Sequence, residues 1–165
     1  ETVFLNKKSG NSLKQMVLRP GIEWEGERSF VQSLIGDTAW KDYSVSTKVF
    51  ITADSNSFAG IIGRAVEIYR SHEEPDAYRF IVYHTGKWEL WAGKIKIATG
   101  HYKMNQSRWI GLSLAMRGNS IKAYIDNHEI ASKTDGRFSH GMAGIGSSYH
   151  GKRFDDFSIQ PNNVN

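Results

Sequence analysis

Cysteine is absent from this sequence, and proline occurs only three times in 165 residues. Without cysteine the chain has no disulfide bridge, no thiol nucleophile and no thiolate metal site. No apolar run is long enough for a membrane-spanning helix, so we expect no membrane span. The sequence also lacks a block of about five or six like charges, which would mark a nucleic-acid-binding arm. Since its 21 basic and 17 acidic residues are interspersed, the net charge of +4 indicates an ordinary solvated surface, and we expect no nucleic acid partner.

The first residues, Glu1-Thr2-Val3-Phe4, lack the basic segment and apolar core of a signal peptide. A mature or excised piece would look the same, so this absence assigns no compartment. With 39% hydrophobic and 23% charged residues in a chain of 165, a single globular domain can bury its own core. We expect a monomer with one domain over residues 1–160 and the start of a linker or tail at residues 161–165.

Alternation of apolar and polar residues dominates wherever the sequence is regular, and turn signals such as Thr85-Gly86 and Asp126-Asn127 separate the alternating segments. No capped amphipathic helix is evident: the best candidate, residues 11–17, is short and runs into Pro20. The pattern predicts an all-β protein, a two-sheet antiparallel β-sandwich or jelly roll. We expect strands at residues 30–35, 43–51, 59–65, 78–84, 87–91, 109–116, 120–125, 141–147 and 154–159.

The last two of these strands form an expected closing hairpin. Residues 141–147 are almost all small, which predicts that a sugar or a neighbouring domain lies close to this strand. In the strand at residues 154–159, alternation places Asp155 and Asp156 on opposite faces. The two carboxylates therefore cannot address one substrate, which argues against catalysis by this pair.

Four stretches, taken in order, resemble a known family: residues 35–43, 59–64, 85–88, and 144–146 with 154–157. Their order and spacing are similar to those of the C-terminal lectin-like domain of galactocerebrosidases, and more widely to concanavalin A-like and laminin G-like jelly-roll modules appended to glycoside hydrolases. The resemblance implies a jelly roll of the lectin/glucanase type, recognition of sugars or glycolipids, and often a bound calcium ion. It places the catalytic carboxylates of such enzymes in a separate barrel domain.

The resemblance also implies a structural calcium site. In the resembling family, acidic residues at the places of Asp37 and Asp155 help to hold the metal, which prefers oxygen ligands. Ala39 stands where some relatives carry an asparagine, so one ligand would be missing or replaced by a carbonyl. The alternative is that Asp37 only forms an Asx turn with the following backbone.

Sugar binding would rest on aromatic platforms and planar polar groups, because pyranose rings stack on Trp or Tyr while their hydroxyls need partners. Among the five tryptophans, we expect Trp40 and Trp109 to pack in the core. Trp88 and Trp91 have opposite parity on one strand, so one of them must lie outside the core. Both are candidate glycan contacts.

Charged and loop residues complete the candidate glycan site. Arg64 and Arg79 lie on neighbouring strands and could clamp vicinal hydroxyls or a carboxylate; alternatively each pairs with a nearby acid such as Glu67 or Asp76. The irregular segment at residues 67–76 contributes Tyr69, unless it is simply a solvent-exposed loop. The remaining candidates are His140 and His150, which flank the small-residue strand.

No Gly-x-Ser-x-Gly elbow and no zinc-ligand spacing of histidines occurs. We therefore predict a non-catalytic carbohydrate-binding module of a secreted or cell-surface glycoside hydrolase or related polysaccharide-active enzyme. Its partners would be an oligo- or polysaccharide, with galactose-containing glycans as the first choice, and the catalytic domain of the same polypeptide. The alternatives are a small jelly-roll glycosidase or lyase, and a laminin G-like protein-interaction domain.

Overall fold

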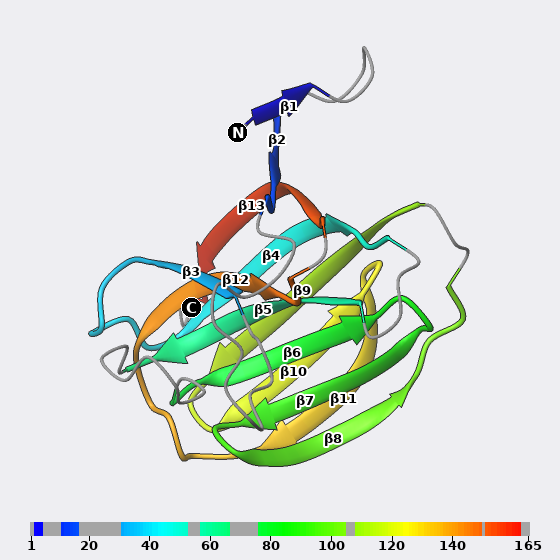
Figure 1. Cartoon of the computed structure of the whole chain (residues 1–165). Coiled ribbons are helices and arrows are strands. Elements are labelled where there is room, and N and C mark those ends of the chain that lie inside the picture. The colour runs from blue at the N-terminus through cyan, green and yellow to red at the C-terminus, as the bar shows by residue number, and fades with distance from the viewer. Residues whose placement is uncertain are drawn as a thin grey trace, which may run out of the picture.

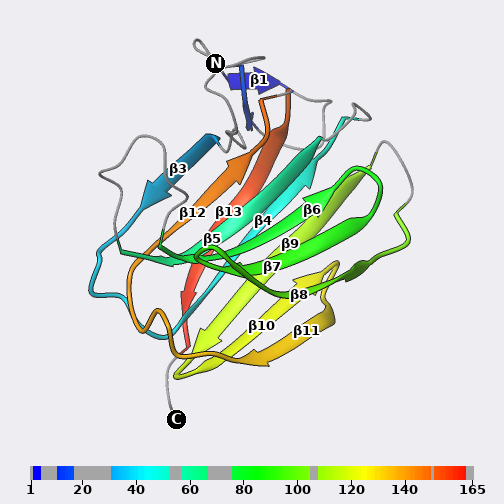
Figure 2. The same cartoon turned by 60° about the horizontal axis from the view of Figure 1, so that its bottom comes forward.

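The structure is a computed structural model that describes residues 2–4, 11–16, 31–52, 57–66, 76–104, 108–149 and 151–162. Within these ranges all regular structure is β-strand, and no helix is present that could span a membrane. The strands form two antiparallel sheets that lie one on the other (Figures 1 and 2). The predicted two-sheet antiparallel β-sandwich is confirmed.

The two sheets contain seven and six strands. The seven-stranded sheet has the order β1 (Thr2–Phe4), β2 (Asn11–Lys14), β13 (Arg153–Pro161), β4 (Tyr43–Phe50), β9 (Trp109–Arg117), β10 (Ser120–Ile125) and β11 (His128–Thr134). The six-stranded sheet has the order β3 (Val31–Ile35), β12 (Met142–Ser147), β5 (Phe58–Ala65), β6 (Tyr78–Tyr83), β7 (Lys87–Ala92) and β8 (Ile95–His101).

The core lies between the sheets and follows the alternation of the sequence. In β4 the side chains of Tyr43, Val45 and Val49 are buried, whereas Ser44, Ser46 and Lys48 face outward. Burying each large apolar side chain contributes about 1.5–3 kcal/mol, so the inner faces supply most of the driving force for folding. The central strands of both sheets contribute in the same way, with Phe80, Leu90, Ile110, Leu112, Leu114 and Met116 among the fully buried side chains.

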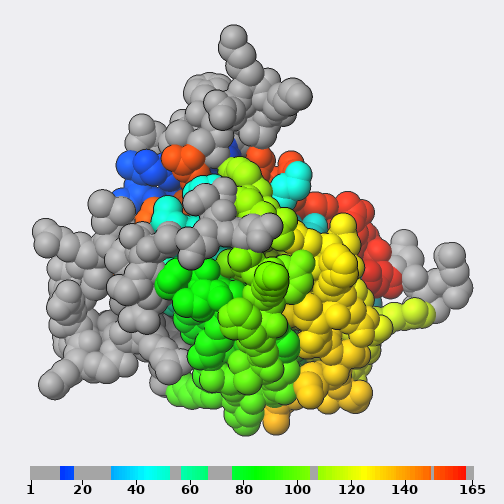
Figure 3. All heavy atoms as spheres, turned by 90° about the vertical axis from the view of Figure 1, so that its right-hand side faces the viewer, coloured from blue at the N-terminus to red at the C-terminus, as the bar shows by residue number. Residues whose placement is uncertain are grey.

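Strands β8 and β11, like β1 and β2, were not indicated by the sequence, and β8 and β11 are each an edge strand of their sheet. Most residues of both are partly or fully exposed, so their apolar alternation is weak. The two edges come together along one side of the sandwich, where β8 (green) meets β11 (yellow to orange) in Figure 3. Residues 11–14, where a short helical turn was the best helix candidate, form strand β2 instead.

One small residue of β12, Gly144, makes room for the neighbouring strand β3, whereas a sugar or a neighbouring domain close to residues 141–147 stays a prediction. β12 lies inside the six-stranded sheet, between β3 and β5. A Cβ on Gly144 would collide with the carbonyl oxygen of Ser33 and the side chain of Leu34, both in β3. The small side chains therefore allow close packing of neighbouring strands.

A β-bulge interrupts β13 and changes which side chains share a face. The register against β4 shifts between Asp155 and Ser158, and Asp156 has a positive φ of 50°. Phe154 and Ile159 consequently both pack on the core despite their opposite parity, while Phe157 is exposed. Such bulges re-aim side chains. The expectation that Asp155 and Asp156 lie on opposite faces is wrong, since both line one hollow.

The sandwich extends slightly beyond the predicted boundary at residue 160. Pro161 still pairs with Tyr43 as the last residue of β13. The backbone N–H of Asn162 donates to the carbonyl of Asp42, and its side-chain amide donates to the carbonyl of Met116. Residues 161 and 162 thus belong to the domain rather than to a tail.

Candidate functional site

Arg64, a predicted glycan contact, is instead a buried structural tie. Its side chain is only 1% exposed, and the residue adopts a positive φ of 52° at the end of β5. The guanidinium donates to the carbonyls of Lys41, Gly118 and Phe138 and to the carboxylate of Asp42, at 2.8–3.0 Å. With these acceptors in place, the group joins several loops and is not available to clamp a sugar.

Arg79 is equally buried but lies on a different part of the six-stranded sheet. It stands opposite Ile62 in β5 and Trp91 in β7. Its guanidinium donates to the carbonyl of Gly93 at 2.7 Å and lies 5.8 Å from the ring centroid of Trp91. Arg64 and Arg79 therefore do not form the predicted exposed clamp, although Arg79 supports the ring of Trp91.

The tryptophans divide differently from the prediction for two of the four. Trp88 is 7% exposed and belongs to the core, whereas Trp91 is half-buried on the outer face, as their opposite parity requires. Trp40 and Trp109 are not core residues, which corrects their assignment to packing: Trp40 is 37% exposed, and Trp109 is half-buried. Trp109 contacts Phe50 edge-on and lines a surface hollow.

Trp91 is part of a group of side chains that we call the Glu89 cluster, on the outer face of the six-stranded sheet. The Glu89 carboxylate is only 2% exposed and accepts hydrogen bonds on both oxygens. Tyr83 and the indole N–H of Trp91 donate to Oε2, each at 3.1 Å. The ammonium groups of Lys87 and Lys96 lie 2.8 and 2.7 Å from Oε1. Arg79, Tyr83, Lys87, Glu89, Trp91 and Lys96 make up the cluster.

The electrostatics of the cluster follow from these contacts. Burial of the Glu89 carboxyl favours its protonated form, but hydrogen bonds from Lys87, Lys96 and Trp91 outweigh burial and hold the pKa at about 2. Each lysine ammonium also lies over an aromatic ring, Lys87 at 5.2 Å from the Tyr83 centroid and Lys96 at 4.9 Å from the Trp91 centroid. With three cations against one carboxylate, the cluster carries an excess of positive charge.

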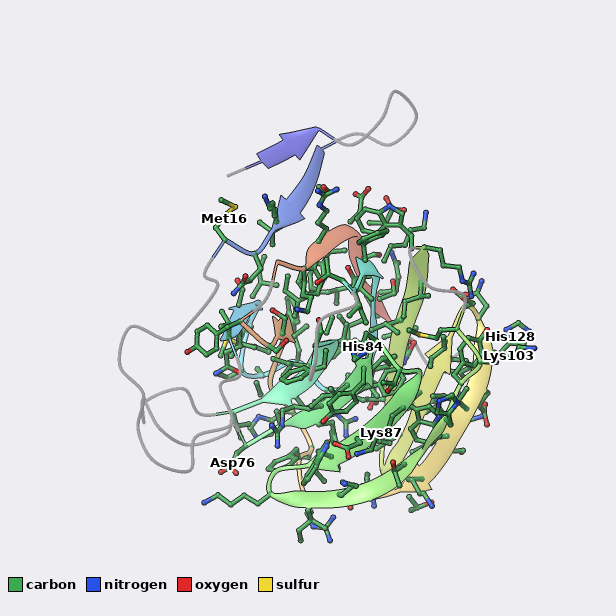
Figure 4. All side chains as sticks on the ribbon, turned by 45° about the vertical axis from the view of Figure 1, so that its right-hand side comes forward. Met16, Asp76, His84, Lys87, Lys103 and His128 are labelled. Atoms are coloured by element: carbon green, nitrogen blue, oxygen red, sulfur yellow. The ribbon has the colours of Figure 1, made fainter. Side chains whose placement is uncertain are left out.

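The exposed parts of the cluster are its lysines and aromatic rings. Lys87 and Lys96 have side chains that are 51% and 36% exposed, and Lys87 is labelled on the green sheet in Figure 4. An ammonium group has three donors, so each lysine can bond to Glu89 and still donate to a ligand. The arrangement can present a half-buried indole with oriented cationic donors beside it.

Most of the Glu89 cluster was missed in the sequence, although a signal for it exists. The hairpin at Thr85-Gly86 pairs Val82 with Trp88 and Ile81 with Glu89. Once that register is known, Tyr83, Glu89 and Trp91 share the outer face by parity. Lys87 shares this parity on β7, whereas Lys96 could not be deduced in this way because it comes from β8, a strand that the sequence did not indicate.

The predicted histidine and loop contacts do not join this cluster. His140, just before β12, is exposed, and its Nδ1 lies 2.7 Å from the carbonyl oxygen of Thr38. Strands β5 and β6 separate β12 from the strand that holds Glu89. Tyr69 and His150 lie outside the described residues.

The predicted calcium ligands Asp37 and Asp155 do not share a site. Asp155 pairs with Lys48 near one end of β4, whereas Asp37 lies in the turn that leads to the other end, where its carbonyl accepts the N–H of Trp40. The length of β4 from Tyr43, next to the turn of Asp37, to Lys48, the partner of Asp155, is roughly 16 Å. Asp37 Oδ1 accepts the N–H of Ala39 at 2.8 Å, the Asx turn of the alternative interpretation. Nowhere in the described ranges do three His, Asp or Glu side chains gather as a metal-binding group.

A second feature is an open hollow of about 860 Å³ on the outer face of the seven-stranded sheet. It lies over β13, β4 and β9, which run side by side in Figure 1, and reaches the turn between β10 and β11. Its lining combines hydroxyl, amide and charged groups with the indole of Trp109 and the side chain of Leu112; the other lining residues are Ser44, Ser46, Thr47, Lys48, Gly111, Ser113, Asp126, Asn127, Asp155, Asp156 and Gln160.

Comparison with protein families gives a match over nearly the whole chain. Residues 2–162 match the family described as "Galactocerebrosidase, C-terminal lectin domain". Galactocerebrosidase of Mus musculus is 24% identical over 154 residues, which are 90% of this chain but only 22% of that protein. The chain therefore spans less than a quarter of the length of the curated relatives that it matches.

Solved structures with the same fold include a carbohydrate binding module and a galectin. The carbohydrate binding module CBM66 from Bacillus subtilis superposes with a TM-score of 0.64 at 17% identity, over 81% of this chain and 84% of that chain. The galectin LEC-6 from Caenorhabditis elegans gives a TM-score of 0.54 at 13% identity, over 85% of this chain and 99% of that chain. At such low identity the likeness establishes the fold alone.

Proposed function

This chain belongs to the family of galactocerebrosidase C-terminal lectin domains, and on that basis we propose that it is a non-catalytic domain that binds glycans over Trp91 on the outer face of the six-stranded sheet. The observation that carries the choice of face is the Glu89 cluster. There a half-buried indole is fixed by a hydrogen bond to a buried carboxylate and is bordered by two partly exposed ammonium groups.

The cluster suits a sugar ring for a physical reason. An indole offers a flat apolar surface for the C–H face of a pyranose, provided that the ring is held in place. Glu89 fixes the Trp91 indole and also Tyr83, so little side-chain entropy remains to be lost on binding. Lys96, over the indole in the free protein, is partly exposed and can move to donate to a sugar hydroxyl.

The positive excess of the cluster bears on the choice of sugar. Lysine and arginine donors favour hydroxyl oxygens and, more strongly, carboxylate or sulfate groups. Galactose-containing glycans are the first choice because of the family to which the chain belongs. We expect acidic forms of such glycans to bind more tightly than neutral ones, with the difference reduced at high salt.

The chemistry of Glu89 supports a domain without catalysis of its own. Glycoside hydrolysis requires a carboxylic acid with a raised pKa and a second carboxylate at a defined distance. The pKa of Glu89 is lowered to about 2, and both of its oxygens already accept hydrogen bonds, so it is unsuited as a general acid. Release of reducing ends from a panel of glycans by the isolated chain would contradict the non-catalytic function.

The attached protein is also part of the proposal. We place this domain, as a monomer, in a secreted or cell-surface glycoside hydrolase, where it keeps the catalytic domain of the same polypeptide near its glycan. Linkage of this kind raises the effective concentration of substrate without any new contact at the active site. A faster turnover of polymeric than of short soluble substrate by the whole enzyme, abolished by deletion of this domain, is the expected result.

The direct test is calorimetric titration of the chain with neutral and acidic galactose-containing oligosaccharides. Trp91→Ala should weaken binding at least about tenfold, which corresponds to about 1.4 kcal/mol. Trp40→Ala, the same change at an exposed tryptophan away from the cluster, serves as the matched control and should bind normally. Thermal melting verifies that both variants fold. Full affinity of a folded Trp91→Ala variant would contradict this choice of face, and a failure of all glycans to bind would contradict the function.

A further inference from the structure

The hollow on the outer face of the seven-stranded sheet has a floor of unusually short side chains. Ser46 in β4 stands between Ser158 in β13 and Ser113 in β9, so three serines lie in one row across three strands. In the next row along the strands, Lys48 stands between Asp155 and Gly111. Ser46 and Ser113 line the hollow, and these short hydroxyl-bearing side chains with longer ones around them make this face concave.

Longer side chains form the walls of the hollow. Trp109 rises at one end, supported edge-on by Phe50 with 5.8 Å between the ring centroids. Asp126, in the turn between β10 and β11, accepts the N–H of Gly111 at 2.8 Å and is held against the floor. The bulge in β13 brings Asp155 and Asp156 to the same hollow.

The charge of this hollow is opposite to that of the Glu89 cluster. Its three carboxylates are Asp126, Asp155 and Asp156, and two of them form ion pairs, Asp156 with Lys48 and Asp126 with Arg108, at 2.6 Å each. The three carboxylates outnumber the two paired cations by one, and Asp155 accepts the N–H of Asp156. An anionic ligand is disfavoured here, while neutral hydroxyls or an amine are favoured.

The chemistry of the lining fits a sugar better than a protein. Protein interfaces are built around an apolar centre with a polar rim. Here serines and aspartates make up much of the lining, and its large apolar groups are Trp109 and Leu112. Hydroxyls and carboxylates of this kind pair with sugar hydroxyls, and the indole of Trp109 can stack on a ring. The volume of about 860 Å³ lies within the range of small-molecule sites.

We infer that this hollow is a second glycan-binding site, specific for neutral or amine-bearing sugars, so that the domain binds glycans on both outer faces. The inference rests on the proposed function, since it extends glycan binding from the Glu89 cluster to the opposite sheet. A domain with two such faces can bridge two chains of a polysaccharide or hold one chain that carries both neutral and acidic segments.

The test uses the indole N–H signals of the five tryptophans in ¹⁵N-labelled protein, assigned by single Trp→Phe variants. The chain is titrated with a neutral, an amine-bearing and an acidic oligosaccharide. The neutral and amine-bearing sugars should shift the Trp109 signal, and the acidic sugar should shift the Trp91 signal preferentially. Ser46→Leu, which fills the floor of the hollow, should abolish the Trp109 response and leave that of Trp91. Ser132→Leu on β11, the matched change at an exposed serine outside the hollow, should leave both.

The possible outcomes separate this inference from the proposed function. A Trp91 response with no Trp109 response in the unchanged protein overturns the second site and leaves the function intact. A Trp109 response alone supports the hollow and moves the glycan away from the Glu89 cluster. A lack of response at either indole overturns both. A Trp109 signal that shifts only when the catalytic domain of the parent enzyme is added makes the hollow a domain interface, which also overturns the inference.

Discussion

The backbone N–H of Arg64 donates a hydrogen bond of 2.7 Å to the hydroxyl of Tyr43 and so joins the two sheets through the core. Tyr43 begins β4 of the seven-stranded sheet, and Arg64 is the last residue but one of β5 in the six-stranded sheet. The same hydroxyl lies within donating distance, 3.0 Å, of two carbonyls: that of Gly141, just before β12, and that of Met142, the first residue of β12. One phenol thus fixes the spacing of the sheets at this end of the sandwich.

Alkaline pH should weaken this link. Burial raises the pKa of Tyr43 to about 12, against the opposing influence of Arg64, and burial likewise raises that of Tyr78 to about 12. Because the folded state resists deprotonation, its stabilisation is complete below the ordinary pKa near 10 and is lost as the pH rises through 12. Urea unfolding should show a falling free energy over this range. Tyr43→Phe should lower the free energy of unfolding by about 1–3 kcal/mol at pH 7. Above pH 10 the free energy of unfolding of this variant should fall less steeply with pH than that of the unchanged protein, and equal slopes would contradict this role of Tyr43.

Removal of the Arg64 guanidinium should destabilise the fold without a direct effect on glycan binding. Arg64→Met removes the donor of three carbonyls and the cationic partner of Asp42, which keeps the N–H of Gly118 as a donor, so we expect a loss of about 3 kcal/mol in the free energy of unfolding. Lys122→Met, which removes a cation from an exposed ion pair with Glu129, should change stability by less than about 1 kcal/mol. Normal stability together with weak glycan binding in the Arg64→Met variant would instead support the predicted glycan contact of Arg64.

Acid should destabilise the domain through Glu89. Its pKa is lowered to about 2, so the stabilisation is present above the ordinary value of 4.5 and is lost as the pH falls through 2. The loss can reach on the order of 3 kcal/mol. Glu89→Gln should be less stable at pH 7 but should show a flatter dependence between pH 4.5 and 2 by urea unfolding. Identical pH profiles for the two proteins would be evidence against the lysine contacts.

Asp37 should act as a turn residue, independently of calcium. Its side chain accepts the N–H of Ala39, and a neutral alanine cannot do so. Asp37→Ala should lower the free energy of unfolding by about 1 kcal/mol, equally in calcium and in chelator. If calcium stabilises the unchanged protein but not the variant, Asp37 is a ligand after all, with partners other than Asp155.

The sequence indicated those features that depend on neighbours along the chain. Alternation assigned the buried and exposed faces of β4, and it separated Trp88 from Trp91. These predictions hold because successive side chains of a strand point to opposite sides whatever the rest of the fold does. The same rule failed at Asp155 and Asp156, since a bulge breaks the alternation and its position depends on the pairing with β4.

The site residues could be predicted only in part, because their roles depend on distant contacts. In the sequence Arg64 is a reasonable sugar contact, because its hydrogen-bond acceptors are not evident there. These acceptors, the carbonyls of Lys41, Gly118 and Phe138, come from three separate parts of the chain and meet only in the fold. Glu89 looked unremarkable in sequence but receives hydrogen bonds from β6, β7 and β8. Burial and hydrogen bonding of this kind arise from packing and leave no local pattern.

By itself the sequence determined the all-β architecture and the family, since alternation, turns and motif order are properties of consecutive residues. Only the tertiary structure decided which polar groups are used internally and which remain for a ligand. It placed Arg64 inside the sandwich, separated Asp37 from Asp155, and brought Ser46, Ser113 and Ser158 into one row. The physical reason is that strand register and sheet stacking, which join segments far apart in the chain, determine the chemistry of each face.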